Sequence, residues 1–303
     1  MSSHYRASSS LRHVVFGTPS NNDALTIRFG CQQGVFERLG IDLELKTLFG
    51  GPAIADAFHS GTIEVGSLGS PSALVPMSKG ARFQVVASGC RQAAHMYLGV
   101  RVGIDDWGGL RGSRIGVLSV GSCPSWIVQK ILTVHGLDPV RDVELVPLHE
   151  AYPQIVDWVA NGQLDACLVT EPNLSIGEAR GILKIWAAAY EPQYLPDFQW
   201  IVRVANEALL ERDPDLVATV LEGCNVASHL AVTETEAFLA FVAHYYGTSV
   251  DEVRPAIRRE VPLYQTDGKL DIPGLEMAVQ MMHELGGVDR RVTVDSFCDF
   301  RFQ

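Results

Sequence analysis

The stretch GVFERLGIDLEL, residues 34–45, decides the fold class. Its first half completes a segment from Asp23 to Leu39 in which apolar residues recur with a roughly helical period, and Gly40 ends that segment. Residues 42–46 then alternate between polar and apolar side chains, as a half-buried strand does. A helix joined to a strand by a single glycine is the repeating unit of an α/β fold.

The same order of strand, loop and helix continues on both sides of this stretch. We expect further strands at 13–17, 62–66, 83–88, 96–101, 114–118, 143–148, 166–170 and 182–187. We expect further helices at 53–58, 125–135, 151–161, 214–233, 234–246, 250–259 and 273–285. Steady alternation of strands and helices favours mixed, mainly parallel sheets flanked by helices.

The length of the chain and a break in this rhythm predict two lobes. The chain has 303 residues, 47% of them hydrophobic and 19% charged, which suits about two domains with packed cores. The segment 103–112 interrupts the alternation, and a second interruption lies near 187–203. We therefore expect a discontinuous lobe I (12–105 and 200–303), a lobe II (106–199), two crossover segments, and a disordered arm at 1–11.

Charge and cysteine content exclude several classes of partner. The formal net charge of −11 disfavours a nucleic acid or an anionic lipid surface as a partner. No run of 18 apolar residues is present, so we expect no membrane insertion. Neither a CxxC pair nor a Cys/His cluster at zinc spacing occurs, so we expect no bound metal. We also expect no cofactor, and we expect the protein to be a monomer or a dimer. The six cysteines are Cys31, Cys90, Cys123, Cys167, Cys224 and Cys298.

The first ten residues, MSSHYRASSS, leave two cellular locations open. They are polar and lack the apolar centre of a secretory signal. The protein is expected in the cytoplasm if Met1 is the native start. It is expected in the periplasm, or otherwise outside the cytoplasm, if a leader was removed.

Five motifs in register resemble those of the type II periplasmic solute-binding protein superfamily. The resemblance covers about residues 12–260 and is closest to the branch that binds aliphatic sulfonates, taurine or nitrate and includes the thiamine-pyrimidine synthase. The motifs are Gly34–Leu45, His59–Gly66, Trp107–Val117, Gly162–Cys167 and Glu171-Pro172, with Gly121-Ser122 in the expected order.

This resemblance implies a two-lobed protein that closes around a ligand in the cleft between its lobes. It implies a small anionic or zwitterionic organic ligand, such as a sulfonate or a taurine-like molecule, which is passed to an ABC importer through its permease. The bottom-up expectation agrees, because ligands of open α/β sheets lie beyond the carboxyl ends of the strands.

Four Gly- and Ser-bearing loops fit that position, each predicted to follow a strand and precede a helix. They span 18–22, 50–52, 68–72 and 119–123, and their backbone N–H groups and hydroxyls could hold an anion without a basic side chain. The alternative is that they are ordinary helix caps. The candidate ligand-binding residues in these loops are Ser20, Asn21, Gly51, Leu68, Gly69, Ser70, Gly121, Ser122 and Cys123.

Three further residues are candidates outside these loops. Glu171 could accept a hydrogen bond from a zwitterion or heterocycle, or it could be a hinge or capping carboxylate. Arg91 follows a predicted strand and could reach the ligand, or it could be a solvated surface side chain. Trp200, beside the second crossover, could stack on a ligand ring or belong to the core.

A cytosolic enzyme or ligand sensor of the same fold is the alternative function. The resemblance extends to a pyrimidine synthase, a desulfinase and decarboxylase-like proteins. However, the loop 67–74 has neither the Lys nor the His of the synthase, and 18–22 lacks the nucleophilic Cys of the desulfinase. Cys123, at a predicted helix N-terminus, is the one thiol whose pKa such a position would lower. We expect no catalytic residue.

Overall fold

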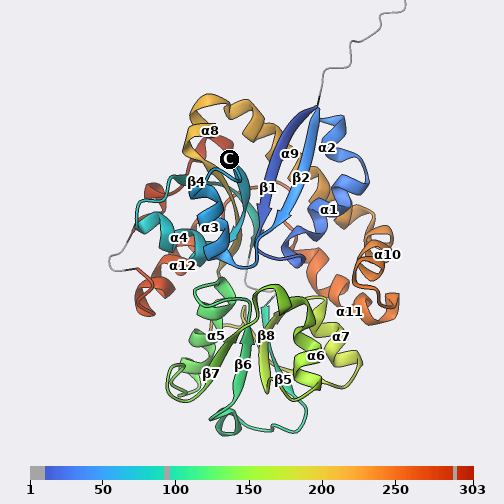
Figure 1. Ribbon diagram of the computed structural model, residues 1–303, viewed down its shortest axis with the longest axis vertical. Coiled ribbons are helices and arrows are strands. Elements are labelled where there is room, and N and C mark those ends of the chain that lie inside the picture. The colour runs from blue at the N-terminus through green and yellow to red at the C-terminus, as the bar shows by residue number, and fades with distance from the viewer. Residues whose placement is uncertain (1–10, 92–95, 289–291) are drawn as a thin grey trace, which may run out of the picture.

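The structure is a computed structural model that describes residues 11–91, 96–288 and 292–303, apart from the side chains of Asp23 and Arg91. The predicted disordered arm, except for its last residue Leu11, lies outside the described residues. Figure 1 shows two lobes, one above the other, each built around a sheet with helices on its faces. The predicted two-lobed α/β fold is confirmed.

The sheet of the first lobe has five strands, four of which point the same way. Only β10 is antiparallel to its neighbours β3 and β4. In spatial order the strands are β2 (Ile41–Thr47), β1 (Arg12–Thr18), β3 (Val65–Gly69), β10 (Gln199–Asn206) and β4 (Phe83–Arg91).

The sheet of the second lobe repeats this arrangement. Its antiparallel member is β5, which pairs with β8 and β9. In each sheet, the antiparallel strand is the first one after the chain arrives from the other sheet. In spatial order the strands are β7 (Glu144–Pro147), β6 (Arg114–Val117), β8 (Ala166–Thr170), β5 (Met96–Arg101) and β9 (Leu183–Ala188).

The position of β5 corrects one part of the predicted division into lobes. A boundary at 105/106 assigns residues 96–101 to the first lobe, but this strand is hydrogen-bonded within the second sheet. The chain therefore leaves the first sheet after Arg91 and returns between Ala188 and Gln199. The remaining boundaries stay a prediction.

Twelve α-helices are seen in the described residues. Those of the first lobe are α1 (Leu25–Gln32), α2 (Val35–Arg38), α3 (Gly51–His59), α4 (Ser70–Ser78), α8 (Glu207–Arg212), α9 (Pro214–Thr233), α10 (Thr235–Tyr246), α11 (Val250–Glu260) and α12 (Ile272–Glu284). Those of the second lobe are α5 (Cys123–Val134), α6 (Ile155–Ala160) and α7 (Asn173–Ala179). In Figure 1, α10 and α11 extend from the first lobe down to the level of α7, which α11 contacts.

Two expectations about local structure are wrong. The single helix predicted from Asp23 to Leu39 is divided into α1 and α2, because Gly34 takes a left-handed conformation with φ 69°. The strand predicted at 62–66 is β3 at Val65–Gly69, and it runs directly into α4. Leu68–Ser72 is therefore not a loop.

The helix α9 is the one described helix that is long and apolar enough to cross a membrane, by length and composition. Half of its apolar window is buried inside the protein, and α9 packs against α1 and α2. Phe36 and Cys224 lie in the apolar core that these helices share with the first sheet. This packing is that of a core helix of the first lobe.

Candidate functional site

The carboxyl ends of the parallel strands of both sheets meet where the lobes touch. The described residues enclose two small pockets there, of about 40 Å³ and about 20 Å³. Both are lined by Thr170 of the second lobe and by Trp200 and Ile201 of the first, so they adjoin each other between the lobes, and we call the two together the cleft. On this measure one water molecule needs about 10–15 Å³, so the two pockets have room for only a few water molecules and the lobes lie close together here.

The two ends of the cleft differ in chemistry. The larger pocket is lined by Asn22, Glu171, Arg203 and Glu260, which we call the charged end. The smaller pocket is lined by Ser20, Gly51, Gly69, Ser122 and Cys123, which we call the glycine–serine end.

The smaller pocket brings together six of the candidate residues, from both lobes: the five of the glycine–serine end and Trp200. Its geometry depends on close approach: a Cβ atom built on Gly69 would lie 2.5 Å from the Cβ of Cys123 across the cleft. Likewise, a Cβ built on Gly50 would lie 2.2 Å from the Oγ of Ser119. Glycine is therefore required at both positions for the lobes to meet as they do.

The hydroxyls expected to hold an anion are engaged within the protein. Ser122 Oγ donates to the carbonyl oxygen of Ser119 at 2.6 Å. Ser70 Oγ donates to the carbonyl oxygen of Gln199 at 2.5 Å, and Ser70 does not line either pocket. These bonds are typical of local turn and strand–helix packing.

Several other candidates lie away from both pockets. Leu68 is fully buried in the core. Asn21 accepts a hydrogen bond from Thr47 at 3.1 Å, and Gly121 accepts one from the indole of Trp126 at 3.1 Å. The side chain of Arg91 lies outside the described residues. Whether any candidate binds a ligand stays a prediction.

The charged end contains an arginine that sequence reasoning missed. Arg203 on β10 is 4% exposed and lines the larger pocket. One guanidinium nitrogen donates to Ser67, and the Nε atom is buried without a hydrogen-bond partner. Among the described side chains, no carboxylate lies within ion-pair distance of Arg203. The signal was present, since a charged residue in the middle of the apolar strand QWIVRVAN is seldom placed there without a role.

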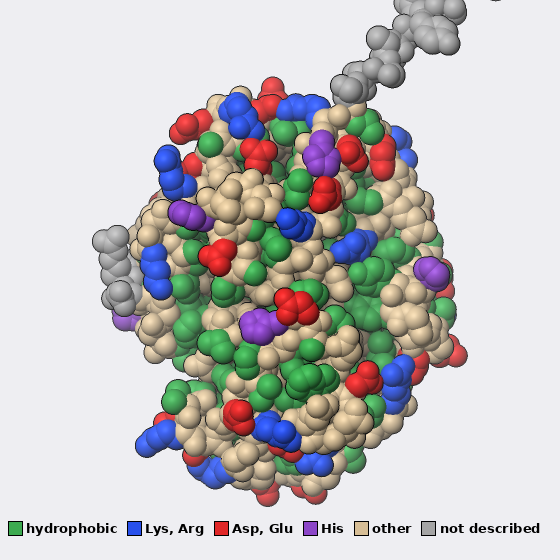
Figure 2. Space-filling view, viewed as in Figure 1, with side chains coloured by type: hydrophobic (Ala, Val, Ile, Leu, Met, Phe, Trp, Pro, Cys, Tyr) green, Lys and Arg blue, Asp and Glu red, His purple; other side chains and the backbone are tan. Residues whose placement is uncertain are grey.

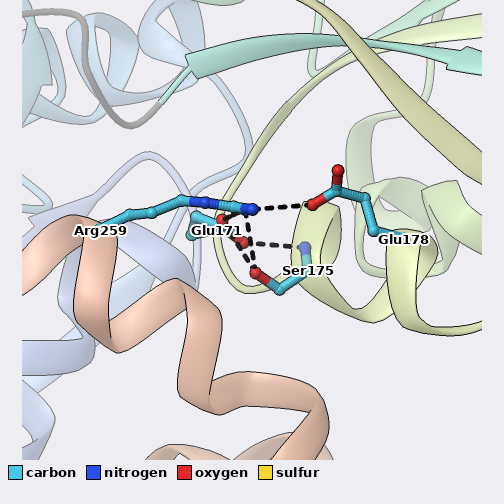
Figure 3. A network of polar contacts seen from close by, with 4 residues as sticks. All are labelled: Glu171, Ser175, Glu178 and Arg259. Atoms are coloured by element: carbon cyan, nitrogen blue, oxygen red, sulfur yellow. Dashed lines mark hydrogen bonds and ion pairs between the residues drawn. The ribbon is translucent and has the colours of Figure 1, made fainter.

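Glu171 anchors a network between the lobes (Figure 3). Its carboxylate accepts hydrogen bonds from the backbone N–H and the hydroxyl of Ser175, both at 2.9 Å, in the first turn of α7. Arg259 of α11 pairs with Glu171 at 2.6 Å and with Glu178 at 2.9 Å. Burial, with the nearby carboxylate of Glu260, raises the pKa of Glu171 above its usual value. The structure thus shows the capping arrangement for Glu171, while a ligand contact stays a prediction.

Asn22 forms a second bridge across the cleft. Its side-chain nitrogen donates to the hydroxyl of Thr170 at 2.5 Å and to the carbonyl oxygen of Glu171 at 2.8 Å. Its side-chain oxygen accepts a hydrogen bond from Tyr246 of α10. One amide thereby ties the first lobe to the carboxyl end of β8.

The outer surface offers other features. Figure 2 shows Lys and Arg side chains interspersed with Asp and Glu over both lobes on this face, and the outline narrows at the left where the lobes meet. A larger, open hollow of about 600 Å³ lies between α9 and the chain end, beside His229 and Phe302. Within the described part of the chain, no group of three His, Cys, Asp or Glu side chains is arranged to hold a metal ion.

Comparisons with known proteins agree with this architecture. "Putative binding protein YtlA" of Bacillus subtilis is 23% identical over 186 residues, which are 60% of this chain and only 55% of YtlA. A protein of Bordetella bronchiseptica RB50 has a similar structure, with a TM-score of 0.83 and 19% identity, covering 97% of this chain and 96% of that one. The alkanesulfonate-binding protein SsuA of Xanthomonas axonopodis pv. citri, bound to MOPS, gives a TM-score of 0.79 at 16% identity, covering 97% and 99%.

The sequence profile of the NMT1-like family matches residues 8–238, which is more than half of the chain. The family match and the structural likeness confirm the resemblance that the five motifs predicted. The chain therefore belongs to the NMT1-like family and has the two-lobed fold of the periplasmic solute-binding proteins.

Proposed function

We propose that this protein captures a small organic solute in the cleft between its lobes and passes it to an ABC importer. The observation that carries this proposal is the pair of adjoining pockets between the lobes, both lined by Thr170 of one lobe and Trp200 of the other. A site shared by two lobes couples binding to closure, because the ligand contacts both lobes only when they have come together.

The solute class is an organic anion or zwitterion, such as a sulfonate or a taurine-like molecule. MOPS is an organic sulfonate, and its presence in the alkanesulfonate-binding relative supports this class. Delivery to a permease places the protein outside the cytoplasm and makes that permease its partner. The family match and the similarity to named binding proteins support this location and partner.

Closure predicts a measurable change of shape. Because the two pockets have room for only a few water molecules, we expect the lobes to separate when a solute enters and to close again around it. A thermal-shift screen of the full chain against sulfonates, carboxylates, pyrimidines and aromatic acids should give a dose-dependent rise in Tm. At a ligand concentration of about 100 Kd the added stability is about 2.7 kcal/mol.

Two further measurements distinguish a carrier from an enzyme. Small-angle scattering should show a smaller radius of gyration with a hit than without it. Mass spectrometry should recover the hit unchanged after prolonged incubation. Chemical conversion of the hit, or binding without any change in radius, would contradict the carrier function.

A further inference from the structure

The environment of Arg203 is not that of an arginine retained for stability. Its side chain is almost wholly buried, yet among the described residues no carboxylate pairs with it. Removing a guanidinium from water is unfavourable by several kcal/mol unless an opposite charge and hydrogen bonds compensate. Ser67 supplies one neutral acceptor, and the Nε hydrogen has none. The described residues of the protein therefore compensate this charge only in part.

The surroundings of Arg203 hold its guanidinium in a defined position. The ring of Phe16 lies 5.8 Å from the guanidinium carbon. On β4, a Cβ built on Gly89 would lie 3.0 Å from that carbon, so the absence of a side chain there leaves the space it occupies. A charged group fixed in advance binds an opposite charge without a further loss of side-chain freedom.

Polar groups of both lobes face the same pocket as Arg203. Asn22 of the first lobe and Thr170 of the second line it and are hydrogen-bonded to each other at 2.5 Å. The carboxylates of Glu171 and Glu260 line it as well, but Glu171 is paired with Arg259 and Glu260 accepts a hydrogen bond from Tyr264. An anion at Arg203 would therefore lie beside the bridge that joins the lobes. Occupation of this position could couple charge recognition to closure.

We propose that Arg203 binds the anionic group of the solute, so that the cleft selects organic sulfonates or carboxylates over neutral molecules of the same shape. This inference rests on the proposed function and specifies the ligand within the same cleft. It places the anion at the charged end, whereas the loop analysis placed it on helix N-termini at the glycine–serine end. Charge-assisted hydrogen bonds from a guanidinium suit both oxyanions, and the test distinguishes them.

The test uses matched pairs of probes that differ only in charge. Isothermal titration of the full chain would compare ethanesulfonate with ethanesulfonamide, and benzoate with benzamide. We expect the wild-type protein to prefer the anion of at least one pair by roughly 10- to 100-fold, the range of one charge-assisted contact. Arg203→Met should remove that preference, and Arg203→Lys should keep part of it. Equal wild-type affinity for both members of each pair, or an unchanged preference in Arg203→Met, would overturn the proposal.

Two controls keep the outcome interpretable. The Tm of ligand-free Arg203→Met should equal or exceed that of the wild type, because the variant removes a poorly compensated buried charge; a large fall in Tm would point to a structural arginine and count against the proposal. Gly89→Ala retains the charge but crowds both the guanidinium and the side chain of Ile201, so it should weaken binding of the anionic member of a pair more than binding of the neutral member. If Arg203→Met does not fold, Gly89→Ala tests whether Arg203 binds the anionic group.

The proposal and the function it rests on fail in different ways. If anionic and neutral solutes bind equally well and close the lobes, only the role of Arg203 is overturned. If no probe and no member of the wider screen binds the wild-type protein, the proposed function and the role of Arg203 both fall.

Discussion

The two ends of the cleft share Thr170, Trp200 and Ile201, but the other residues that line them differ in size and charge. At the glycine–serine end, small residues let the backbones of the two lobes approach, and the hydroxyl of Ser122 is bonded inside its own turn. At the charged end, Arg203 and Glu171 lie buried in fixed positions. The comparison suggests a division of roles, in which one end sets how closely the lobes meet and the other sets which solute they hold.

Gly69→Ala should prevent the two lobes from meeting closely at the glycine–serine end, and we expect it to have the largest effect on ligand affinity. The backbone of Gly69 is compatible with alanine, but the added Cβ would lie 2.5 Å from the Cβ of Cys123 in the other lobe. Overpacking of this kind destabilises the closed form by about 1–3 kcal/mol, which lowers ligand affinity by roughly 5- to 150-fold. Isothermal titration measures the loss of ligand affinity, and small-angle scattering measures whether the lobes still close.

The matched control for Gly69→Ala is a compensating substitution. Cys123→Gly removes the atom with which the new Cβ collides, so the double variant should recover most of the affinity. A double-mutant cycle measures this coupling directly. Strictly additive effects of the two substitutions would show that the lobes do not meet through this contact.

Asn22→Ala tests the bridge at the charged end and should have an intermediate effect. The variant removes two hydrogen bonds to the second lobe, those to Thr170 and to the carbonyl oxygen of Glu171. Each net bond contributes about 0.5–1.5 kcal/mol, so affinity should fall by roughly 5- to 100-fold.

The neighbouring asparagine provides the control for this bridge. Asn21 bonds to Thr47 within its own lobe, so Asn21→Ala should leave affinity within about threefold of the wild type. Equal losses in Asn21→Ala and Asn22→Ala would contradict the assignment of Asn22 as an interlobe bridge.

Glu171→Gln should show itself chiefly as a change in the pH dependence of stability. Burial and the nearby Glu260 raise the pKa of Glu171 above 4.5, so the folded state binds this proton more tightly than the unfolded chain does. The stability that this carboxyl contributes is greatest below that value and declines as pH rises through the raised pKa. Glutamine does not titrate, so the Tm of the variant relative to wild type should increase between about pH 4 and pH 7.

Glu178→Gln is the comparison for this pH profile. Glu178 pairs with the same arginine, but about a third of its side chain is exposed. Its substitution also removes a partner of Arg259, so the comparison separates the loss of that ion pair from the effect of burial at Glu171. Parallel profiles for wild type and Glu171→Gln would show that Glu171 titrates as it does in the unfolded chain.

The elements that the sequence predicted well are those with a strong local pattern. The helix predicted at 214–233 is α9 within the same bounds, and the strand predicted at 96–101 is β5. The prediction for strand β3, VGSLG, was wrong by three residues because all five residues are buried and the composition is that of a turn. No polar and apolar alternation marks such a strand.

The candidate site was predicted only in part, and for a related reason. Loop position correctly brought Ser20, Gly51, Gly69, Ser122 and Cys123 to one pocket, because strand ends of parallel sheets share an edge. It did not identify Arg203, which lies within a strand rather than after one.

By itself, the sequence determined the alternation of strands and helices, the two-lobed α/β class and the family motifs, because these follow from periodicity and spacing along the chain. Only the tertiary structure decided which sheet receives β5, and which side chains enclose the cleft with Thr170 and Trp200. Strand pairing and burial depend on contacts between residues up to about two hundred positions apart, such as Asn22 with Tyr246. A local pattern in the sequence does not identify which distant residues contact each other.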